Sequence, residues 1–360
     1  FLSVAFSQLS ISQTKKNKEK SELSKINLSG FKFRSVGPAL TAGRIADIAV
    51  HSRNPKIYYV AVASGGVWKT ENSGNTYHPI FDSQGSYSIG CLKIDPNNEH
   101  VIWVGTGENN NQRSVAYGDG VYKSLDGGKS WKNMGLKNSE HIGMIEIDPN
   151  NSNNIYVAAY GPLWKEGGER GLYFSKNGGK EWELILKTDE HTGVNEVHLD
   201  PRNSSTIYAT THQRRRHVYT YVGGGLGSKI YKSTDSGKSW KELKSGLPNS
   251  IKGRIGMDIS PANPDYLYAL VEAENNKQGL YVSKDRGESW DKKNKYVTSG
   301  NYYQEVFCDP INCDKVFFMD TWLHHTSDGG KTVVKTGEKS KHVDNPVSYT
   351  HLTLPTRYRV

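Results

Sequence analysis

Short stretches of alternating apolar and polar residues recur along the chain, and each leads into a polar turn that contains glycine. Residues 120–123 (GVYK), 171–174 (GLYF) and 229–232 (KIYK) are examples. Alternation with a period of two predicts strands. The turn that follows has the same eight-residue pattern in six places, beginning at Thr70, Ser124 (SLDGGKSW), Ser175, Ser233, Ser283 and Thr326. A self-similar unit of roughly 50 residues indicates a propeller, a solenoid or an array.

The recurring positions of this turn have structural explanations. An aspartate, or asparagine in two copies, is placed to accept hydrogen bonds from the turn's own amides, and a following glycine can supply a positive φ. The closing tryptophan is expected to be buried between neighbouring units. We interpret these residues as structural, because a catalytic acid is not needed six times at one fixed turn. They are Asp126, Trp131, Asn177, Trp182, Asp235, Trp240, Asp285, Trp290 and Asp328.

A second turn recurs ahead of the first one in each unit. It consists of an apolar stretch, an Asp-Pro pair and another apolar stretch, as at Asp95, Asp148, Asp200 and Asp309. Proline's fixed φ and the short carboxylate favour a tight turn. Each unit then holds four strands, A to D, with the Asp-Pro turn joining A to B and the glycine turn joining C to D. Four short antiparallel strands per repeat are typical of a propeller blade.

The sequence therefore predicts an all-β fold, a β-propeller of four-stranded antiparallel blades with about six blades in this chain. Residues 31–38 (FKFRSVGP) align with the fourth strand of an ordinary blade. This extra strand implies at least seven blades in the intact protein.

The glycine turn, S-x-D-x-G-x-S/T-W, resembles the Asp-box, or bacterial neuraminidase repeat, of sialidases, xyloglucanase-type glycosidases and sortilin-type propellers. Its coupling to the Asp-Pro turn is most similar to large secreted bacterial proteins grouped with the sortilin N-terminal domain, many of them labelled glycosyl hydrolases. The resemblance covers about residues 31–345. It implies the propeller fold, whereas the activity stays open because the same turns occur in enzymes and in non-enzymes.

Composition excludes several classes of function. The net charge of +9 arises from 46 basic and 37 acidic residues that are spread over the whole chain, so we expect no nucleic-acid partner. No apolar stretch approaches the roughly 18 residues of a membrane span. No phosphate loop, dinucleotide fingerprint or metal-ligand pattern is present, so no cofactor and no metal are expected. Cys308 and Cys313 flank one A to B turn and could be oxidised or free, and Cys91 is expected to be a small core residue.

The two ends of the chain differ from the repeats. Residues 1–13 look like the remnant of a secretory signal peptide, and residues 14–30 like a disordered lead-in. Export to the periplasm, the cell surface or the medium is therefore expected. Residues 31–345 are assigned to the propeller. The last stretch, 346–360, resembles the translation of a library adapter and is expected to be a non-native tail on a truncated chain.

Function is expected on the face that carries the B to C and D to A connections, because irregular loops on a rigid scaffold are its usual place. We call this the top face, and the face with both repeated turns the bottom face. The B to C loops carry Glu108, Arg113, Trp164, His212 and Arg214. The basic loop around Arg214 is either a solvated loop packed by its own tyrosines or a site for an acidic or planar ligand.

The D to A connections are expected at the mouth of the central channel. Counting seven residues back from each A to B turn leads to Arg44, His141 and Tyr302, with Arg254, Tyr303, Asn195, Glu196 and Glu305 close by. Arginine, histidine, tyrosine and carboxylate side chains around a channel mouth form a reasonable ligand pocket.

Two classes of function remain. A sialidase would need three arginines, a tyrosine with a glutamate, and an acid; Arg44, Arg254, Tyr302 and Glu305 resemble part of that set and are the candidate catalytic residues. A xyloglucanase-type enzyme would need two opposed carboxylates, one in a Thr-Asp-x-Gly-Gly phrase, but residues 63–66 read ASGG. We therefore favour a scaffold that binds a protein, peptide or carbohydrate on its top face, with a glycoside hydrolase as the alternative. The sequence predicts no oligomeric state.

Overall fold

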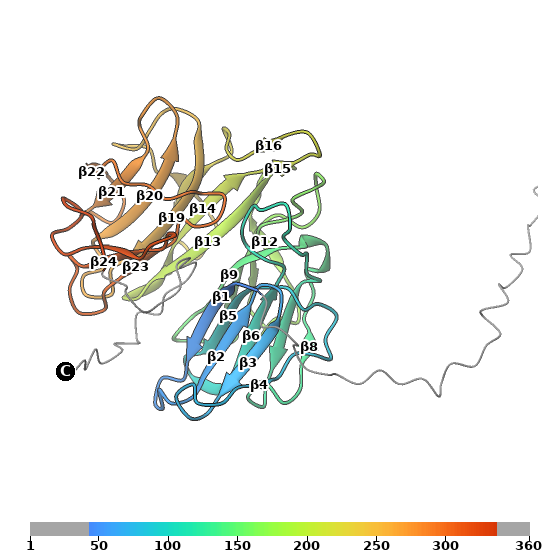
Figure 1. Cartoon of the computed structure of the whole chain (residues 1–360). Coiled ribbons are helices and arrows are strands. Elements are labelled where there is room, and N and C mark those ends of the chain that lie inside the picture. Colours follow the sequence, from blue (N-terminus) through green and yellow to red (C-terminus); the bar gives the residue numbers. More distant parts are fainter. Residues whose placement is uncertain (1–42, 337–360) are drawn as a thin grey trace, which may run out of the picture. The chain divides into compact units, whose positions relative to one another are not determined.

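The computed structural model describes residues 43–336, which form six four-stranded antiparallel sheets in chain order (Figure 1). The predicted fold, an all-β propeller with six blades in this chain, is confirmed. The expectations for residues 1–13, 14–30, 31–38 and 346–360 lie outside the described residues. The described residues contain no helix with the length and hydropathy of a membrane span.

Each blade is built from consecutive strands, except that blade 4 also contains an inserted hairpin. Blade 1 contains β1 (Ile45–Val50), β2 (Tyr58–Val62), β3 (Gly66–Thr70) and β4 (His78–Pro79). Blade 2 contains β5 (Ile89–Asp95), β6 (Asn98–Thr106), β7 (Val121–Ser124) and β8 (Lys132–Asn133). A short 3-10 helix, η2 (Lys137–Ser139), leads into blade 3, which contains β9 (Ile142–Ile147), β10 (Ile155–Ala159), β11 (Gly171–Ser175) and β12 (Glu183–Leu186).

The remaining blades follow the same order. Blade 4 contains β13 (Thr192–Asp200), β14 (Asn203–Gln213), β17 (Lys229–Ser233) and β18 (Lys241–Glu242), and its inserted hairpin contains β15 (Arg215–Arg216) and β16 (Tyr221–Val222). Blade 5 contains β19 (Lys252–Ile259), β20 (Leu267–Ala273), β21 (Gly279–Ser283) and β22 (Asp291–Asn294). Blade 6 contains β23 (Val306–Cys308), β24 (Val316–Phe318), β25 (His324–Thr326) and β26 (Val334–Lys335).

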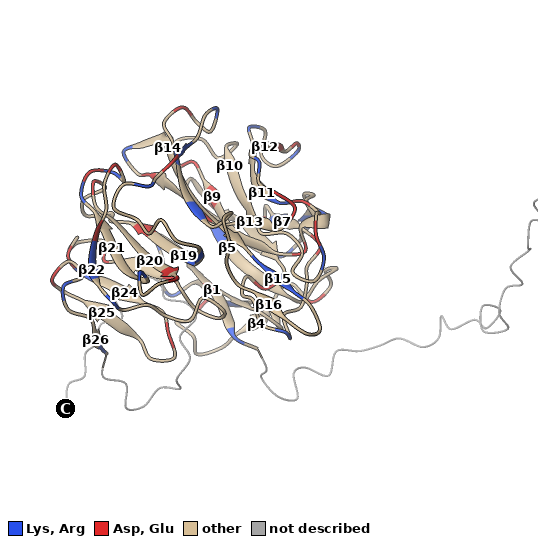
Figure 2. Cartoon of the chain, turned by 90° about the horizontal axis from the view of Figure 1, so that it is seen from above, with Lys and Arg blue, Asp and Glu red and all other residues tan. Residues whose placement is uncertain are grey.

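The first strands of consecutive blades contact one another from β1 to β23 and line the middle of the molecule. Figure 2 shows five of them, β1, β5, β9, β13 and β19, around the middle, with acidic and basic positions interspersed over the blades. Inner strands such as β10 and β21 are buried at every position, because each sheet packs against the sheets of its neighbouring blades. The fold therefore places A-strand side chains at a central channel.

The apolar core consists of five clusters, and each cluster joins two consecutive blades, from blades 1 and 2 to blades 5 and 6. Cys91 belongs to the cluster between blades 2 and 3, as expected of a core residue. Within residues 43–336, no such cluster joins blade 6 to blade 1. We call the junction of blades 6 and 1 the seam.

The repeated glycine turn has the predicted internal hydrogen bonds. In the copy of blade 2, Asp126 Oδ1 accepts the Ser130 amide at 2.9 Å and the Ser124 hydroxyl at 2.8 Å. Gly128 has φ of +90°, a conformation that favours glycine. These bonds hold the pKa of Asp126 down at about 2, first of all through the Ser130 hydroxyl. The turn thus keeps an ionised aspartate as its hydrogen-bond acceptor.

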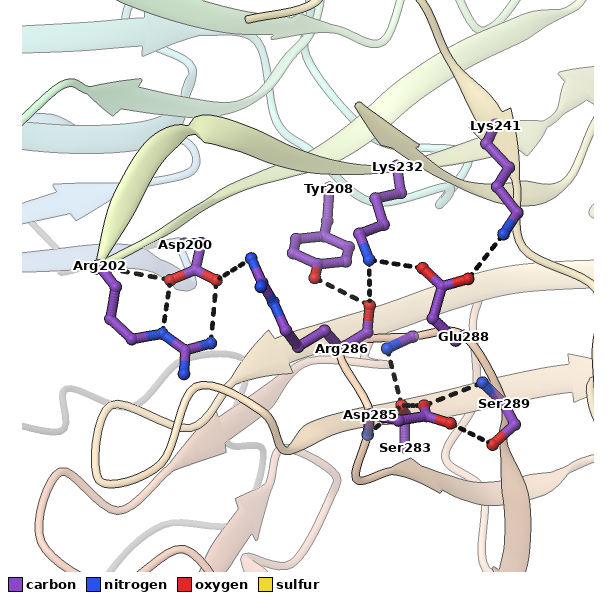
Figure 3. Close-up of polar contacts among 11 residues, drawn as sticks. Asp200, Arg202, Tyr208, Lys232, Lys241, Ser283, Asp285, Arg286, Glu288 and Ser289 are labelled. Atoms are coloured by element: carbon purple, nitrogen blue, oxygen red, sulfur yellow. Dashed lines mark hydrogen bonds and ion pairs between the residues drawn. The ribbon is translucent and has the colours of Figure 1, made fainter. Parts of the chain in front are cut away.

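The same turn also fastens each blade to the preceding one. In blade 5 the Arg286 carbonyl accepts the Tyr208 hydroxyl at 2.9 Å and Lys232 Nζ at 2.8 Å, both from blade 4 (Figure 3). Arg286 Nη2 also lies 3.3 Å from Asp200 Oδ2, in the A to B turn of blade 4. The two repeated turns therefore meet on the bottom face and connect the blades there.

The closing tryptophans contact the preceding blade, and each D strand begins one residue after its tryptophan. The indole N–H groups of Trp131, Trp182 and Trp240 donate to carbonyls of the preceding blade at 2.7–2.8 Å. Trp290 is buried in the cluster between blades 4 and 5, and its indole N–H has no partner among the described residues.

Candidate functional site

Arg44 and Tyr302 come together at the upper end of the channel, across the seam. Arg44 Nη1 donates to the Tyr302 hydroxyl at 3.0 Å, and its guanidinium lies 4.6 Å from the Tyr302 ring centroid. Arg44 also forms an ion pair with Glu108, which is 1% exposed and accepts Asn110 Nδ2 at 2.8 Å. Tyr303 is buried and stacks on Tyr302. These candidates therefore bind one another in this structure.

Arg254 and Glu305 form a second pair just below. Arg254 Nη2 lies 3.3 Å from Glu305 Oε1, and the arginine is 2% exposed. Burial raises the pKa of Glu305 to about 8, although Arg254 acts in the opposite direction. At neutral pH Glu305 therefore keeps its proton in most molecules and can donate a hydrogen bond.

The two candidate histidines are buried and neutral. His141 Nδ1 lies 2.8 Å from the Glu108 carbonyl, and burial holds its pKa well below the ordinary value. His212 is hydrogen-bonded to the Tyr160 hydroxyl and to the Gly223 carbonyl, and burial lowers its pKa to about 3. Both rings position loops, and whether they contact a ligand stays a prediction.

The basic loop of blade 4 folds inward. Arg214 is fully buried, lies 3.4 Å from the Tyr160 ring centroid, and donates to the Asn110 carbonyl at 2.9 Å. Arg216 is also buried and donates to the Asn111 carbonyl and to Asn301 Oδ1. The interpretation as a solvated loop is therefore wrong for both arginines. Their N–H groups donate hydrogen bonds to loops of blades 2 and 3 and to the loop before blade 6.

Together these loops cover the upper end of the channel. The Asn111 amide donates to the Asn301 carbonyl at 3.0 Å, and Asn111 Nδ2 donates to the Gly300 carbonyl at 3.1 Å. We call residues 108–112, 160–164, 214–222 and 300–302 the cap. Sequence reasoning brought most of these residues to the same face, but it did not show that they would hold each other.

The top face also presents exposed aromatic side chains, Trp164 and Tyr219 on loops of the cap and Tyr87 and Tyr117 outside it. Arg113 is exposed beside them. Hydrogen bonding fixes the loops that carry them, as in the Ser88 hydroxyl donating to the Ala116 carbonyl at 2.8 Å. The exposed fractions are 64% for Tyr87, 72% for Tyr117, 42% for Trp164 and 85% for Tyr219. Of these, sequence reasoning had selected only Trp164 as a ligand-binding candidate; the others stand in loops without a chemical motif.

Below the cap lies a cavity of about 770 Å³. Its lining includes Arg254 and Glu305 at the capped end and Pro96 and Pro261, from A to B turns, at the other end. Polar A-strand side chains line its middle: Asp47, Lys93, Glu146, Glu196, His198 and Asp258. Except for Glu196, sequence reasoning missed this set, although Glu146, His198 and Asp258 each stand two residues before the first residue of the A to B turn.

Several of these carboxylates connect the A strands of neighbouring blades. Asp47 Oδ2 accepts the Leu92 amide at 2.8 Å, and Asp258 Oδ2 accepts the Cys308 amide at 2.7 Å. Burial raises the pKa of Asp47 and of Asp258 to about 6 in spite of these bonds. Their charges are therefore costly at neutral pH.

The described residues hold few other candidates for chemistry. Cys91, Cys308 and Cys313 are free thiols in this structure. Glu166, Glu190 and His191 place ligand atoms within 4.8 Å of one another on exposed loops, an arrangement that could hold a metal. Exposed carboxylates of this kind commonly bind nothing.

The blades and turns define a class of protein, the β-propeller repeat proteins, and the chain is similar to sortilin and to xyloglucanases of this class. The family profile described as "Sortilin, neurotensin receptor 3" matches residues 170–327.

Two curated proteins are similar to about half of the chain or slightly more. Sortilin of Rattus norvegicus is 28% identical over 179 residues, 48% of this chain and 20% of its own length. A probable oligoxyloglucan-reducing end-specific xyloglucanase of Neosartorya fischeri is 24% identical over 248 residues, 59% of this chain and 28% of its own. The chain thus spans about a fifth to a quarter of the length of these relatives.

Among solved structures, an ancestral GH74 enzyme matches with a TM-score of 0.60 and 20% identity. The match covers 81% of this chain and 38% of that one. This likeness supports the fold alone.

Proposed function

We propose that this chain is an exported binding scaffold that recognises a protein, peptide or carbohydrate ligand with its top-face loops. The observation that carries the proposal is the set of exposed aromatic rings, Tyr87, Tyr117, Trp164 and Tyr219, on loops that polar contacts hold in place, as in the cap. Aromatic side chains bring a large contact area at a low entropic cost, and a fixed support removes part of the cost of ordering them on binding. The apolar stretch in residues 1–13 supports export.

The alternative is a glycoside hydrolase acting near the channel mouth. The similarity to xyloglucanases favours it, and Glu305, protonated at neutral pH, has the property of a general acid. The cap opposes it, because Arg44, Glu108 and Tyr302 are engaged with one another where a sugar would have to enter.

Binding to a glycan array that includes xyloglucan oligosaccharides, and to a displayed peptide library, tests the proposal. We expect Tyr117→Ala and Tyr219→Ala to weaken binding of any selected ligand at least about tenfold, since each removes an exposed aromatic contact. The control is Ile311→Ala, which removes an equally exposed apolar side chain from a bottom-face turn. Loss of binding in this control, with no loss in the top-face variants, would contradict the proposal.

Assays of xyloglucan and sialoside hydrolysis distinguish the glycoside hydrolase from the binding scaffold. Release of reducing sugar that Glu305→Gln abolishes and Tyr219→Ala leaves unchanged would favour the hydrolase over the scaffold.

A further inference from the structure

The cavity under the cap opens toward the bottom face. Loop contacts from Asn111 to Gly300 and Asn301 cross its upper end. At its lower end the lining residues Ser52, Pro96 and Pro261 are exposed to solvent. A ligand that uses the cavity in this form therefore enters past the A to B turns, on the face opposite the aromatic loops.

The lining of this cavity is acidic, although the whole chain carries a charge of +9. Its carboxyl groups come from all six blades: Asp47, Asp95, Glu146, Glu196, Asp258 and Glu305. Glu146 is paired with Lys93 at 2.7 Å, and Glu305, protonated at neutral pH, lies 3.3 Å from Arg254.

The other four carboxylates form no ion pair with a lysine or arginine of the described residues. Glu196 Oε2 lies 3.5 Å from His198 Nε2, and Asp258 Oδ1 lies 3.8 Å from His198 Nδ1. His198 is thus the shared ion-pair partner of Glu196 and Asp258. Asp47 accepts the backbone amides of Ile48 and Leu92. Low-dielectric walls around unbalanced charges of one sign concentrate the field on the space between them.

A further acceptor in the lining has no donor. Asn195 is 2% exposed and lines the cavity; its Nδ2 donates to the Ile255 carbonyl at 2.9 Å, whereas its Oδ1 has no hydrogen-bond partner among the described residues. A buried acceptor without a donor is costly. A ligand with several N–H donors would remove this cost.

We propose that the cavity is a binding site for alkylammonium groups, carried by a polyamine or by a lysine side chain that enters from the bottom face. An ammonium group offers three donors and one positive charge, which match carboxylate and amide oxygens placed around it. Its aliphatic stem suits the apolar part of the lining, which includes Ala46, Ile48 and Met144. The volume lies within the range of small-molecule sites.

Calorimetric titration of the full chain at low salt tests the proposal, with spermidine and an acetylated peptide containing two lysines as probes. Low salt is used because screening weakens such contacts. We expect saturable binding of at least one probe. Tighter binding of spermidine would identify the small molecule as the source of the ammonium, and tighter binding of the peptide would identify the lysine side chain.

Two variants of the cavity lining should change the affinity for the probes in opposite directions. We expect Glu146→Gln to weaken binding about tenfold and Lys93→Met to tighten it several-fold, since each changes one charge facing the ligand. The matched control is Glu288→Gln, because Glu288 pairs with Lys232 and Lys241 at 2.8 and 2.6 Å on the bottom face, outside the cavity. Its affinity should stay unchanged.

Met144→Lys places an ammonium inside the cavity without removing an ion pair. We expect this variant to lose binding of both probes and to unfold at a higher temperature. Absence of saturable binding, or equal affinities in Glu146→Gln, Lys93→Met and Glu288→Gln, would overturn the proposal.

Discussion

At the scale of single residues, the copies of the repeated turn differ in a way that affects their stability. Blade 3 has Asn177 where the other strong copies have aspartate, and it keeps the bonds of Oδ1 to the Ser175 hydroxyl and the Glu181 amide, both at 3.0 Å. Its Nδ2 donates to Glu181 Oε2 at 3.0 Å, whereas Asp126 and Asp285 accept a serine hydroxyl with their second oxygen. Asparagine at position 177 therefore fits the glutamate at position 181, because its amide N–H donates to the carboxylate.

We expect Asn177→Asp to destabilise the protein by about 1 kcal/mol, because a hydrogen bond to Glu181 is replaced by repulsion between two partly exposed carboxylates. The double variant Asn177→Asp with Glu181→Ser restores the pattern of the other turns and should recover the loss. Urea denaturation measures both values. A double variant no more stable than the single one would contradict this account of the turn.

At the scale of elements, the β15–β16 hairpin depends on one side chain. Arg216 donates to the Asn111 carbonyl at 2.6 Å and lies 4.4 Å from the Tyr221 ring centroid. Its neighbour Arg215 has Nε and Nη1 without hydrogen-bond partners among the described residues. Substitution of Arg215 is therefore a matched control for substitution of Arg216 on the same short strand.

We expect Arg216→Gln to loosen the hairpin by about 2 kcal/mol, through loss of a charged hydrogen bond and a cation–π contact. Amide exchange at residues 217–220 should become faster by more than tenfold, while Arg215→Gln leaves it unchanged. Equal exchange rates in the two variants would show that the cap is held by other contacts.

The strands could be predicted from the sequence, and the cap could not, for a physical reason. Turns such as the one at Asp126 are stabilised by bonds within eight residues, so the local sequence contains the information. Arg214 is instead held by groups of residues 110, 111 and 161, and its burial depends on loops from other blades. The same limit applies to the channel. The sequence around Glu146 does not show that its carboxylate lines a cavity, because that cavity forms only when the A strands of the other five blades surround it.

At the scale of the whole molecule, buried acids determine how stability depends on pH. Burial raises the pKa of Asp47 and Asp258 from 3.8 to about 6 and that of Glu305 from 4.5 to about 8. The folded chain therefore keeps these protons when the unfolded chain has lost them, and the free energy of unfolding falls as the pH rises from about 4 to 8. Turn aspartates such as Asp126, with a pKa of about 2, act oppositely and lose their contribution as the pH falls below 4.

We expect maximum stability near pH 4, with a decline toward pH 8, measured by urea denaturation at each pH. Glu305→Gln should flatten the part of the decline between pH 6 and 8. Stability that rises steadily from pH 5 to 8 would contradict the burial of these carboxyl groups.

The seam changes how the whole assembly can come apart. Within residues 43–336 the blades are joined by five apolar clusters in a row, and blades 6 and 1 meet through polar contacts such as the one between Arg44 and Tyr302. A closed circle has no first unit to lose, whereas in this row blades 1 and 6 each share an apolar cluster with one neighbour among the described residues. The free energy of such a row is approximately a sum over neighbours, as in a linear repeat array. Loss of structure should therefore start at blades 1 and 6 and move inward one blade at a time, leaving blades 3 and 4 for last.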